Sequence, residues 1–255
     1  MKIAVTGKGG VGKTTFVSIL AGLFAREGRD VLAVDADPDS NLGLALGFSE
    51  AELDAITPVS AMTDLVSERT GAAKDGFGRF FRMNPQVSDI PDRFAREKDG
   101  VRLLVMGTVR TGGGGCVCPE HVMLKRIISH LVTSGGGIVI MDMEAGLEHL
   151  GRGTAGMVDF FIVVAEPGAR SIQTYRRIKK LAGDLGVEKV YVAGNKVRSE
   201  EDREFIRARV DEGDLLGFVP YSDAVAEADK GGRPPFEAGE DVTRGIEGIK
   251  KRMMV

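Results

Sequence analysis

The chain has 255 residues, of which 43% are hydrophobic, and its 34 Lys and Arg against 37 Asp and Glu give a formal net charge of −3. This apolar content is enough for a full core, and a single α/β domain of this length is ordinary. The near balance of charge offers no excess of cations for phosphodiesters, so nucleic acid is not the expected partner.

The start of the chain shows no basic segment followed by an apolar stretch, and the longest unbroken apolar run, residues 160–165, is too short to cross a bilayer. Only one residue separates the two cysteines, Cys116 and Cys118, so a disulfide between them would close a strained ring. These features predict a cytoplasmic protein in a reducing compartment, without a membrane partner.

Strand and helix patterns alternate along the chain. Residues 2–6 form a short β pattern before a glycine-rich loop, and residues 14–27 then show helical periodicity until Gly28. Further apolar runs, continuous rather than alternating, lie at 31–34, 101–106, 138–141, 160–165, 190–193 and 215–219, with helical stretches at 119–131, 171–185 and 199–210. Continuous runs are typical of strands buried on both faces.

The alternation predicts one α/β domain over residues 1–255, a doubly wound and mostly parallel sheet with helices on both faces. Ligands should gather at the carboxyl ends of its strands. Residues 47–100 are less regular, with polar stretches and scattered Gly and Pro, and are interpreted as an insertion over those strand ends.

Residues 7–14 read GKGGVGKT and satisfy the phosphate-loop pattern G-x-x-x-x-G-K-[ST], in the strand-loop-helix context that the pattern requires. Its glycines let backbone N–H groups turn onto phosphate oxygens at a helix N-terminus. Lys13 is expected to hold the β- and γ-phosphates, and the Thr14 hydroxyl to bind Mg²⁺. The loop residues expected to bind ATP or ADP are Gly9, Gly10, Val11, Gly12, Lys13, Thr14 and Thr15. The chain is therefore predicted to be a P-loop NTPase that hydrolyses ATP.

Acidic residues follow two of the predicted strands. Asp142 ends the run at 138–141, where a carboxylate can hold Mg²⁺ directly or through water, and the alternative is a solvated strand-end carboxylate. The cluster Asp35, Asp37 and Asp39 follows the run at 31–34 and lies near the same phosphates. One of these acids is expected to orient water, and the alternative is a turn whose acids cap the next helix.

Residues 195–198, which read NKVR after the strand at 190–193, bear on which base the bound nucleotide carries. A guanine-selective N-K-x-D loop needs a carboxylate at its last position, where this chain has Arg198, so adenine is favoured. The alternative for Asn195 is that it only closes a strand end.

The second lysine of the loop, Lys8, makes the pattern resemble the deviant Walker A family of septum-site, plasmid-partition, nitrogenase iron-protein and metal-cluster assembly ATPases. The resemblance implies a homodimer in which Lys8 reaches the partner's nucleotide, and it matches Asp37 to the water-activating aspartate. The expected catalytic residues are therefore Lys8, Lys13 and Asp37. The alternative for Lys8 is a solvated loop cation.

Three further segments resemble the nickel-insertion ATPases of carbon monoxide dehydrogenase maturation, the CooC family. They are residues 35–40 (DADPDS), 113–120 (GGGCVCPE) and 141–150 (MDMEAGLEHL), joined by Glu166-Pro167 and by Val219-Pro220-Tyr221. The resemblance implies that Asn195, Pro220 and Tyr221 contact adenine. Lys196, which follows Asn195, is also expected to bind the nucleotide. It also implies an apo carbon monoxide dehydrogenase or acetyl-CoA synthase as client.

Cys116 and Cys118 could bind a metal, because thiolates are soft ligands suited to Ni²⁺ or Zn²⁺. One chain offers two thiols, so a four-thiolate site needs two copies joined across a dimer axis. The alternative is a pair of small buried residues with inert thiols. His121 could add a ligand, but it lies outside the resemblance and is expected to face solvent.

Two other functions stay open. A spatial organiser like the septum-site ATPase would use its C-terminal helix on a membrane, and Ile246, Ile249 and Met253 do form a stripe beside basic residues, although core packing explains it better. A reductase like the nitrogenase iron protein would share an iron–sulfur cluster between subunits. The cysteines of that protein are far apart in sequence, unlike the pair here.

Overall fold

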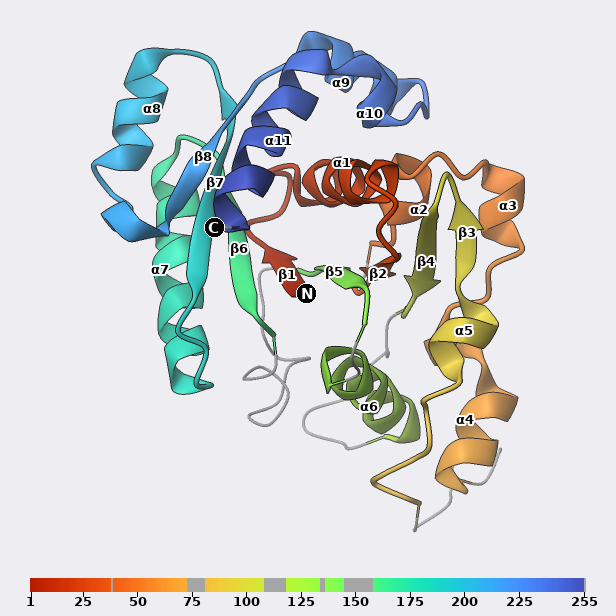
Figure 1. The fold of residues 1–255 in the computed structure, drawn as a ribbon. Helices are drawn as coiled ribbons and strands as arrows, with labels where there is room; N and C mark the ends of the chain where they lie inside the picture. The colour runs from red at the N-terminus through yellow and green to blue at the C-terminus, as the bar shows by residue number, and fades with distance from the viewer. Residues whose placement is uncertain (38, 73–80, 108–117, 134–135, 145–157, 255) are drawn as a thin grey trace.

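The structure, a computed structural model, describes residues 1–37, 39–72, 81–107, 118–133, 136–144 and 158–254. Within these residues the chain forms an eight-stranded sheet in the order β3-β4-β2-β5-β1-β6-β7-β8 (Figure 1). The strands are β1 (Lys2–Thr6), β2 (Val31–Asp35), β3 (Arg96–Lys98), β4 (Val101–Val105), β5 (Ile138–Asp142), β6 (Phe160–Ala165), β7 (Val190–Val197) and β8 (Leu215–Pro220). Neighbouring strands are parallel except at the β3 edge, where β3 runs antiparallel to β4.

Helices cover both faces of the sheet. They are α1 (Lys13–Arg26), α2 (Leu42–Ala45), α3 (Glu50–Asp54), α4 (Thr63–Thr70), α5 (Ile90–Phe94), α6 (Pro119–Thr133), α7 (Ala169–Asp184), α8 (Glu200–Arg207), α9 (Asp223–Lys230), α10 (Pro235–Ala238) and α11 (Glu240–Met253), with 3-10 turns at Val59–Ala61 and Glu212–Asp214. Figure 1 shows α1 and α11 above the sheet and α6 below it. The doubly wound α/β fold predicted from the sequence is confirmed.

The hydrophobic core has two layers, one on each face of the sheet. Along β1, Ile3 and Val5 belong to the layer shared with α1 and α11, whereas Ala4 belongs to the layer shared with α6 and α7. All three β1 residues are fully buried. Because both faces are covered, the strands need apolar residues at successive positions, which explains their continuous runs.

Each apolar run that predicts a strand forms one, and each predicted helix is present within a few residues of its expected bounds. The sequence pattern does not predict β3, because its three residues, two of them exposed, carry no apolar pattern. The segment 47–100 contains α3, α4, α5, a 3-10 turn and β3.

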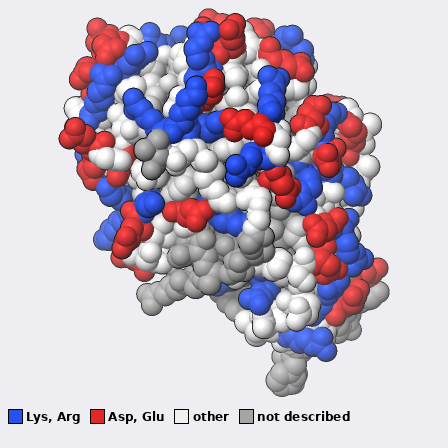
Figure 2. All heavy atoms as spheres, in the orientation of Figure 1, with Lys and Arg blue, Asp and Glu red and all other residues white. Residues whose placement is uncertain are grey.

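The apolar stripe of α11 lies inside the molecule. Ile246 and Ile249 are each 1% exposed, in the layer that also holds residues of α1 and β8, and Met253 is partly buried against the same layer. The core-packing interpretation of the stripe is therefore confirmed. No helix in the described part of the chain has both the length and the apolar character needed to span a membrane, and Figure 2 shows basic and acidic side chains interspersed over the visible face.

The end of β7 departs from regular pairing. The strand runs to Val197, beyond the apolar run at 190–193, and its register with β8 shifts between Gly194 and Val197. Lys196 in this stretch has a left-handed φ of 57°. Such a local irregularity redirects side chains, and here it lies beside the glycine-rich loop.

Candidate nucleotide site

The glycine-rich loop joins β1 to α1 at the middle of the sheet, between the ends of β5 and β6. Gly12 is the N-cap of α1 with φ 92°, and a Cβ there would lie 2.5 Å from Nδ2 of Asn195. A Cβ at Gly9 or Gly10 would meet nothing within 4 Å, so this side of the loop is open. An open loop at a helix N-terminus is a favourable place for phosphate.

A cavity of about 660 Å³ opens over the loop. Its walls include Gly9, Gly10, Gly12, Lys13, Thr14, Thr15, Asp37, Asp39, Asn41, Glu144, Asn195, Lys196, Pro220 and Tyr221. They come from the carboxyl ends of several strands, where the fold class predicts a ligand. The size is that of a small-molecule site, which typically measures about 300–1,000 Å³. Of the predicted nucleotide-binding residues, Val11 is fully buried in the core layer shared with α1, and its expected contact with the nucleotide stays a prediction.

Thr14 and Asp142 lie together at the floor of the site. The Thr14 hydroxyl donates to Oδ2 of Asp142 at 2.7 Å. The other carboxylate oxygen of Asp142, Oδ1, is buried and has no hydrogen-bond partner among the described residues. A buried, unsatisfied carboxylate oxygen beside a hydroxyl is a donor set that suits the oxygen-binding ion Mg²⁺, so these residues fit the expected metal.

Burial raises the pKa of Asp142 to about 6, and the nearby charge of Asp37 adds to this. The hydrogen bond from Thr14 and the charge of Lys13 act in the opposite direction. The charged form of Asp142 is therefore destabilised by burial, and a bound cation would stabilise it.

The aspartates after β2 divide into two environments. Asp35 is 1% exposed and accepts backbone N–H groups from Leu42 at 3.1 Å and Asp37 at 3.3 Å, so it caps the turn into α2. Burial, followed by the charge of Asp142, raises the pKa of Asp35 to about 7. Asp37 instead lines the cavity, with Oδ2 at 3.6 Å from Nζ of Lys13. Asp37 is therefore placed to act on a ligand, whereas Asp35 shapes the loop.

Lys8 pairs with Glu166 of its own chain, at 3.3 Å between Nζ and Oε1. Glu166 is the first residue after β6, which lies next to β1. The Glu166-Pro167 motif does not by itself predict this contact, although a carboxylate at the carboxyl end of a strand indicates proximity to the loop. The action of Lys8 on a second chain stays a prediction.

Asn195 and Lys196 contact the glycine-rich loop itself. Nδ2 of Asn195 donates to the Val11 carbonyl at 2.7 Å, and Nζ of Lys196 donates to the Gly10 carbonyl at 2.6 Å. Their expected contact with adenine is not tested by these bonds.

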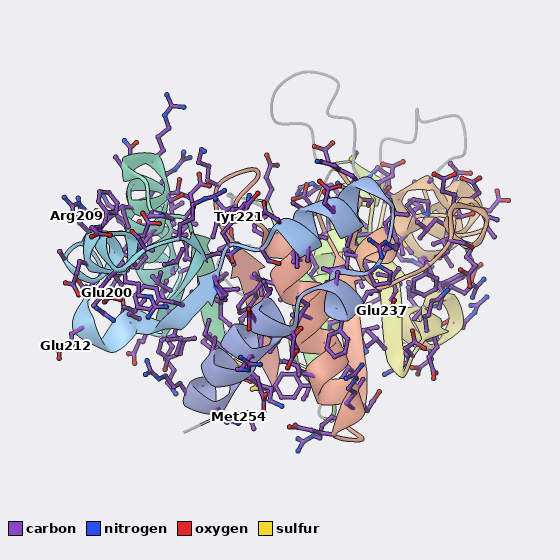
Figure 3. The ribbon with its side chains drawn as sticks, turned by 90° about the horizontal axis from the view of Figure 1, so that it is seen from above. Glu200, Arg209, Glu212, Tyr221, Glu237 and Met254 are labelled. Atoms are coloured by element: carbon purple, nitrogen blue, oxygen red, sulfur yellow. The ribbon has the colours of Figure 1, made fainter. Side chains whose placement is uncertain are left out.

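Pro220 and Tyr221 form another wall of the cavity, and the Arg198 guanidinium lies 3.4 Å from the centroid of the Tyr221 ring. In Figure 3, Tyr221 lies near the middle of the molecule, while Arg209 and Glu212 lie at its edge. Val225 and Ala226 of α9 complete this side. No motif marks these small apolar residues, so sequence reasoning missed them.

Of the cysteine pair, Cys116 lies outside the described residues. Cys118 is partly buried, and its carbonyl accepts the N–H of Val122 at 3.1 Å at the start of α6. Burial raises the pKa of the Cys118 thiol, while the backbone N–H of His121 partly opposes the rise. Among described residues, no three or more His, Cys, Asp or Glu side chains are grouped as a metal site.

Comparison with known proteins identifies the family of the chain. Residues 2–236 match the family described as "CobQ/CobB/MinD/ParA nucleotide binding domain". The chain is 49% identical to the carbon monoxide dehydrogenase accessory protein CooC of Rhodospirillum rubrum over 91% of this chain and 88% of that protein. It is 45% identical to an uncharacterised ATP-binding protein of Methanocaldococcus jannaschii, over 92% and 90%.

Solved structures share the fold at low sequence identity. The MinD cell division protein of Aquifex aeolicus has a TM-score of 0.68 at 20% identity, covering 100% of this chain and 97% of that one. A putative plasmid partition protein of Borrelia burgdorferi bound to AMPPNP also scores 0.68, at 13% identity over 99% and 98%. This chain is a P-loop ATPase that belongs to the CobQ/CobB/MinD/ParA nucleotide-binding family and, within it, to the family of the carbon monoxide dehydrogenase accessory protein CooC.

Proposed function

We propose that this ATPase is a maturation factor that helps to insert nickel into carbon monoxide dehydrogenase or acetyl-CoA synthase. The observation that carries the proposal is the 49% identity to CooC over 91% of the chain. The nucleotide cycle would drive the delivery, and the metal is its cargo.

Mg·ATP would lie in the cavity over the loop, with Lys13 on the phosphates and with Thr14 and Asp142 toward the ion. Mg²⁺ supplies charge neutralisation on the phosphates when it is bound. Asp37 would orient the attacking water, a role supported by its place on the cavity wall near Lys13. Because this chemistry relies on positioning and electrostatics, hydrolysis should be slow.

The working unit is proposed to be a homodimer. Lys8 would leave Glu166 and reach the nucleotide of the other subunit, so each site would be incomplete in a single chain. Charge supplied at the developing negative charge of the transferred phosphoryl group is a strong catalytic contribution.

The cargo site is proposed to combine Cys116 and Cys118 of both subunits around one Ni²⁺ or Zn²⁺. Each chain has two cysteines in total, and a closed thiolate site takes about four sulfurs. Nucleotide binding would alter metal affinity by changing how the subunits meet.

The test is deletion of the gene under limiting nickel. Carbon monoxide dehydrogenase protein should still be made, but it should be nickel-poor and weakly active, and excess nickel in the medium should partly restore its activity. Complementation with the wild-type gene should restore activity, and complementation with Lys13→Ala should not. Full activity of the deletion strain at limiting nickel would reject the client assignment.

A further inference from the structure

Two adjacent side chains at the end of β7 bind two adjacent carbonyls of the glycine-rich loop. Asn195, which is 8% exposed, donates to the carbonyl of Val11 at 2.7 Å, and Lys196 donates to that of Gly10 at 2.6 Å. The partners are 184 and 186 residues apart in sequence. These contacts connect the loop to the end of β7.

The backbone at Lys196 adopts a left-handed conformation. Lys196 and Asp99 are the non-glycine residues with positive φ in the described part of the chain, and Lys196 has φ 57°. A side chain in this region is unfavourable because its Cβ crowds the backbone. In this conformation the Lys196 ammonium donates to the Gly10 carbonyl, so a favourable charged hydrogen bond accompanies the strain.

Fixing a carbonyl also fixes the N–H group of the same peptide unit, because the unit is planar and trans, with its C=O and N–H pointing in opposite directions. Asn195 on the Val11 carbonyl therefore aims the Gly12 N–H, at the N-cap of α1, away from Asn195. Lys196 on the Gly10 carbonyl sets the Val11 N–H, which lies 3.4 Å from the carbonyl of Lys8.

A glycine-rich loop loses much conformational entropy when it takes one shape. Donors that hold its carbonyls before the ligand arrives leave less entropy to be lost on binding phosphate. This advantage is independent of which base the nucleotide carries.

We propose that Lys196, together with Asn195, is a positioning residue that holds the loop in its phosphate-binding shape, rather than a reader of the base. The inference needs only nucleotide binding at the loop. It does not depend on the proposed cargo or client, so its failure would leave those proposals untouched.

The test uses the full chain and the variant Lys196→Met, which keeps the aliphatic stem and removes the ammonium. Affinity is measured for Mg·ATP, Mg·GTP and Mg·tripolyphosphate, the last of which has no base. All measurable affinities should fall by the same factor, on the order of tenfold, with an unchanged ratio of ATP to GTP. Lys196→Arg keeps a cationic donor and should recover part of the loss.

Hydrogen exchange of the free protein provides a readout that needs no ligand. Peptides that contain residues 9–12 should exchange faster in Lys196→Met than in the wild type, because their carbonyl anchor is lost. The control is Lys251→Met, on an exposed part of α11, which should change neither binding nor loop exchange.

The proposal is overturned if Lys196→Met leaves exchange of the loop unchanged. It is also overturned if the variant weakens ATP while tripolyphosphate binding stays at the wild-type level, since that result would make Lys196 a base contact. Circular dichroism and the melting temperature of each variant identify a folding defect. If Lys196→Met has a folding defect, the proposal is tested by the same exchange measurement on Lys196→Arg, which preserves the donor.

Discussion

Lys8 and Glu166 form an ion pair within one chain, 3.3 Å apart, with about a third of each side chain exposed. If Lys8 acts on the nucleotide of a second subunit, it must leave this partner first. The pair therefore opposes the proposed dimer, and its exposure limits the effect to about 1 kcal/mol or less.

Glu166→Gln should consequently strengthen ATP-dependent dimerisation, by up to about thirtyfold in the dissociation constant, because each dimer breaks two such pairs of about 1 kcal/mol or less. Sedimentation equilibrium with Mg·ATP measures this directly. Lys8→Ala and the double variant Lys8→Ala/Glu166→Gln should dimerise equally, because the pair is already broken in both. Weaker dimerisation of Glu166→Gln would show instead that Glu166 contacts the other subunit.

Mixed dimers test the direction in which Lys8 acts. Lys8→Ala and Asp37→Asn should each retain ATP binding and lose turnover, since each removes a group needed for hydrolysis. If Lys8 acts across the interface, a mixed dimer contains one complete site. Equal mixing should then recover up to about a quarter of wild-type turnover, because half of randomly formed dimers are mixed.

No recovery at any mixing ratio would place Lys8 and Asp37 in the same chain's site. Exchange of subunits is verified with two affinity tags, so that a negative result reports on chemistry rather than on mixing. Unaltered turnover in Asp37→Asn would move the water-orienting role to Asp39, the other aspartate of this segment that lines the cavity.

The phosphate loop and its helix could be predicted from sequence because the signals are local. The glycine pattern and the apolar runs each lie within a few residues, and they place Lys13 and Thr14 at a helix start. Asp142 follows from the same reasoning, since it ends a buried strand.

The contacts of Lys8 and Lys196 could not be predicted in the same way. Glu166 is 158 residues from Lys8, and Gly10 is 186 residues from Lys196. They meet because β1 lies beside β6 and because the end of β7 is irregular. Strand order and local register shifts depend on the packing of the whole sheet, which no short window of sequence contains.

Asp142 should make the free protein less stable at neutral pH. Its folded-state pKa, about 6, lies above the ordinary value of 3.8, so the folded chain binds the proton more tightly than the unfolded chain. The contribution of this group to the free energy of unfolding therefore falls as pH rises from about 4 to about 6. The loss is on the order of 3 kcal/mol, because the pKa rises from 3.8 to about 6 and one pKa unit corresponds to about 1.4 kcal/mol.

Asp142→Asn should raise the melting temperature of the nucleotide-free protein above pH 6 and weaken its pH dependence, since Asn still offers an oxygen to Thr14. Part of the pH dependence should remain through Asp35, whose pKa is also raised. The same variant should lose the extra thermal stabilisation that Mg²⁺ adds to ATP. A lower melting temperature without nucleotide would contradict the cost assigned to the buried carboxylate.

The metal stoichiometry tests the proposed cargo site. Anaerobically purified dimer should bind one Ni²⁺ or Zn²⁺ per two chains, and Cys116→Ser or Cys118→Ser should each abolish tight binding while ATP binding persists. Metal analysis and oligomeric mass are measured on the same sample.

The pH dependence of metal binding follows from the thiols. A ligating cysteine must lose its proton, and burial raises the pKa of Cys118 above its ordinary value of 9.0. Below that pKa, the apparent affinity should fall by about tenfold per pH unit for each thiol that must ionise. Cys118→Ser should weaken metal binding, and the binding that remains should depend less steeply on pH. One metal per chain in a monomer, with the same pH slope, would mean that groups of a single chain complete the site and that the metal does not join two subunits.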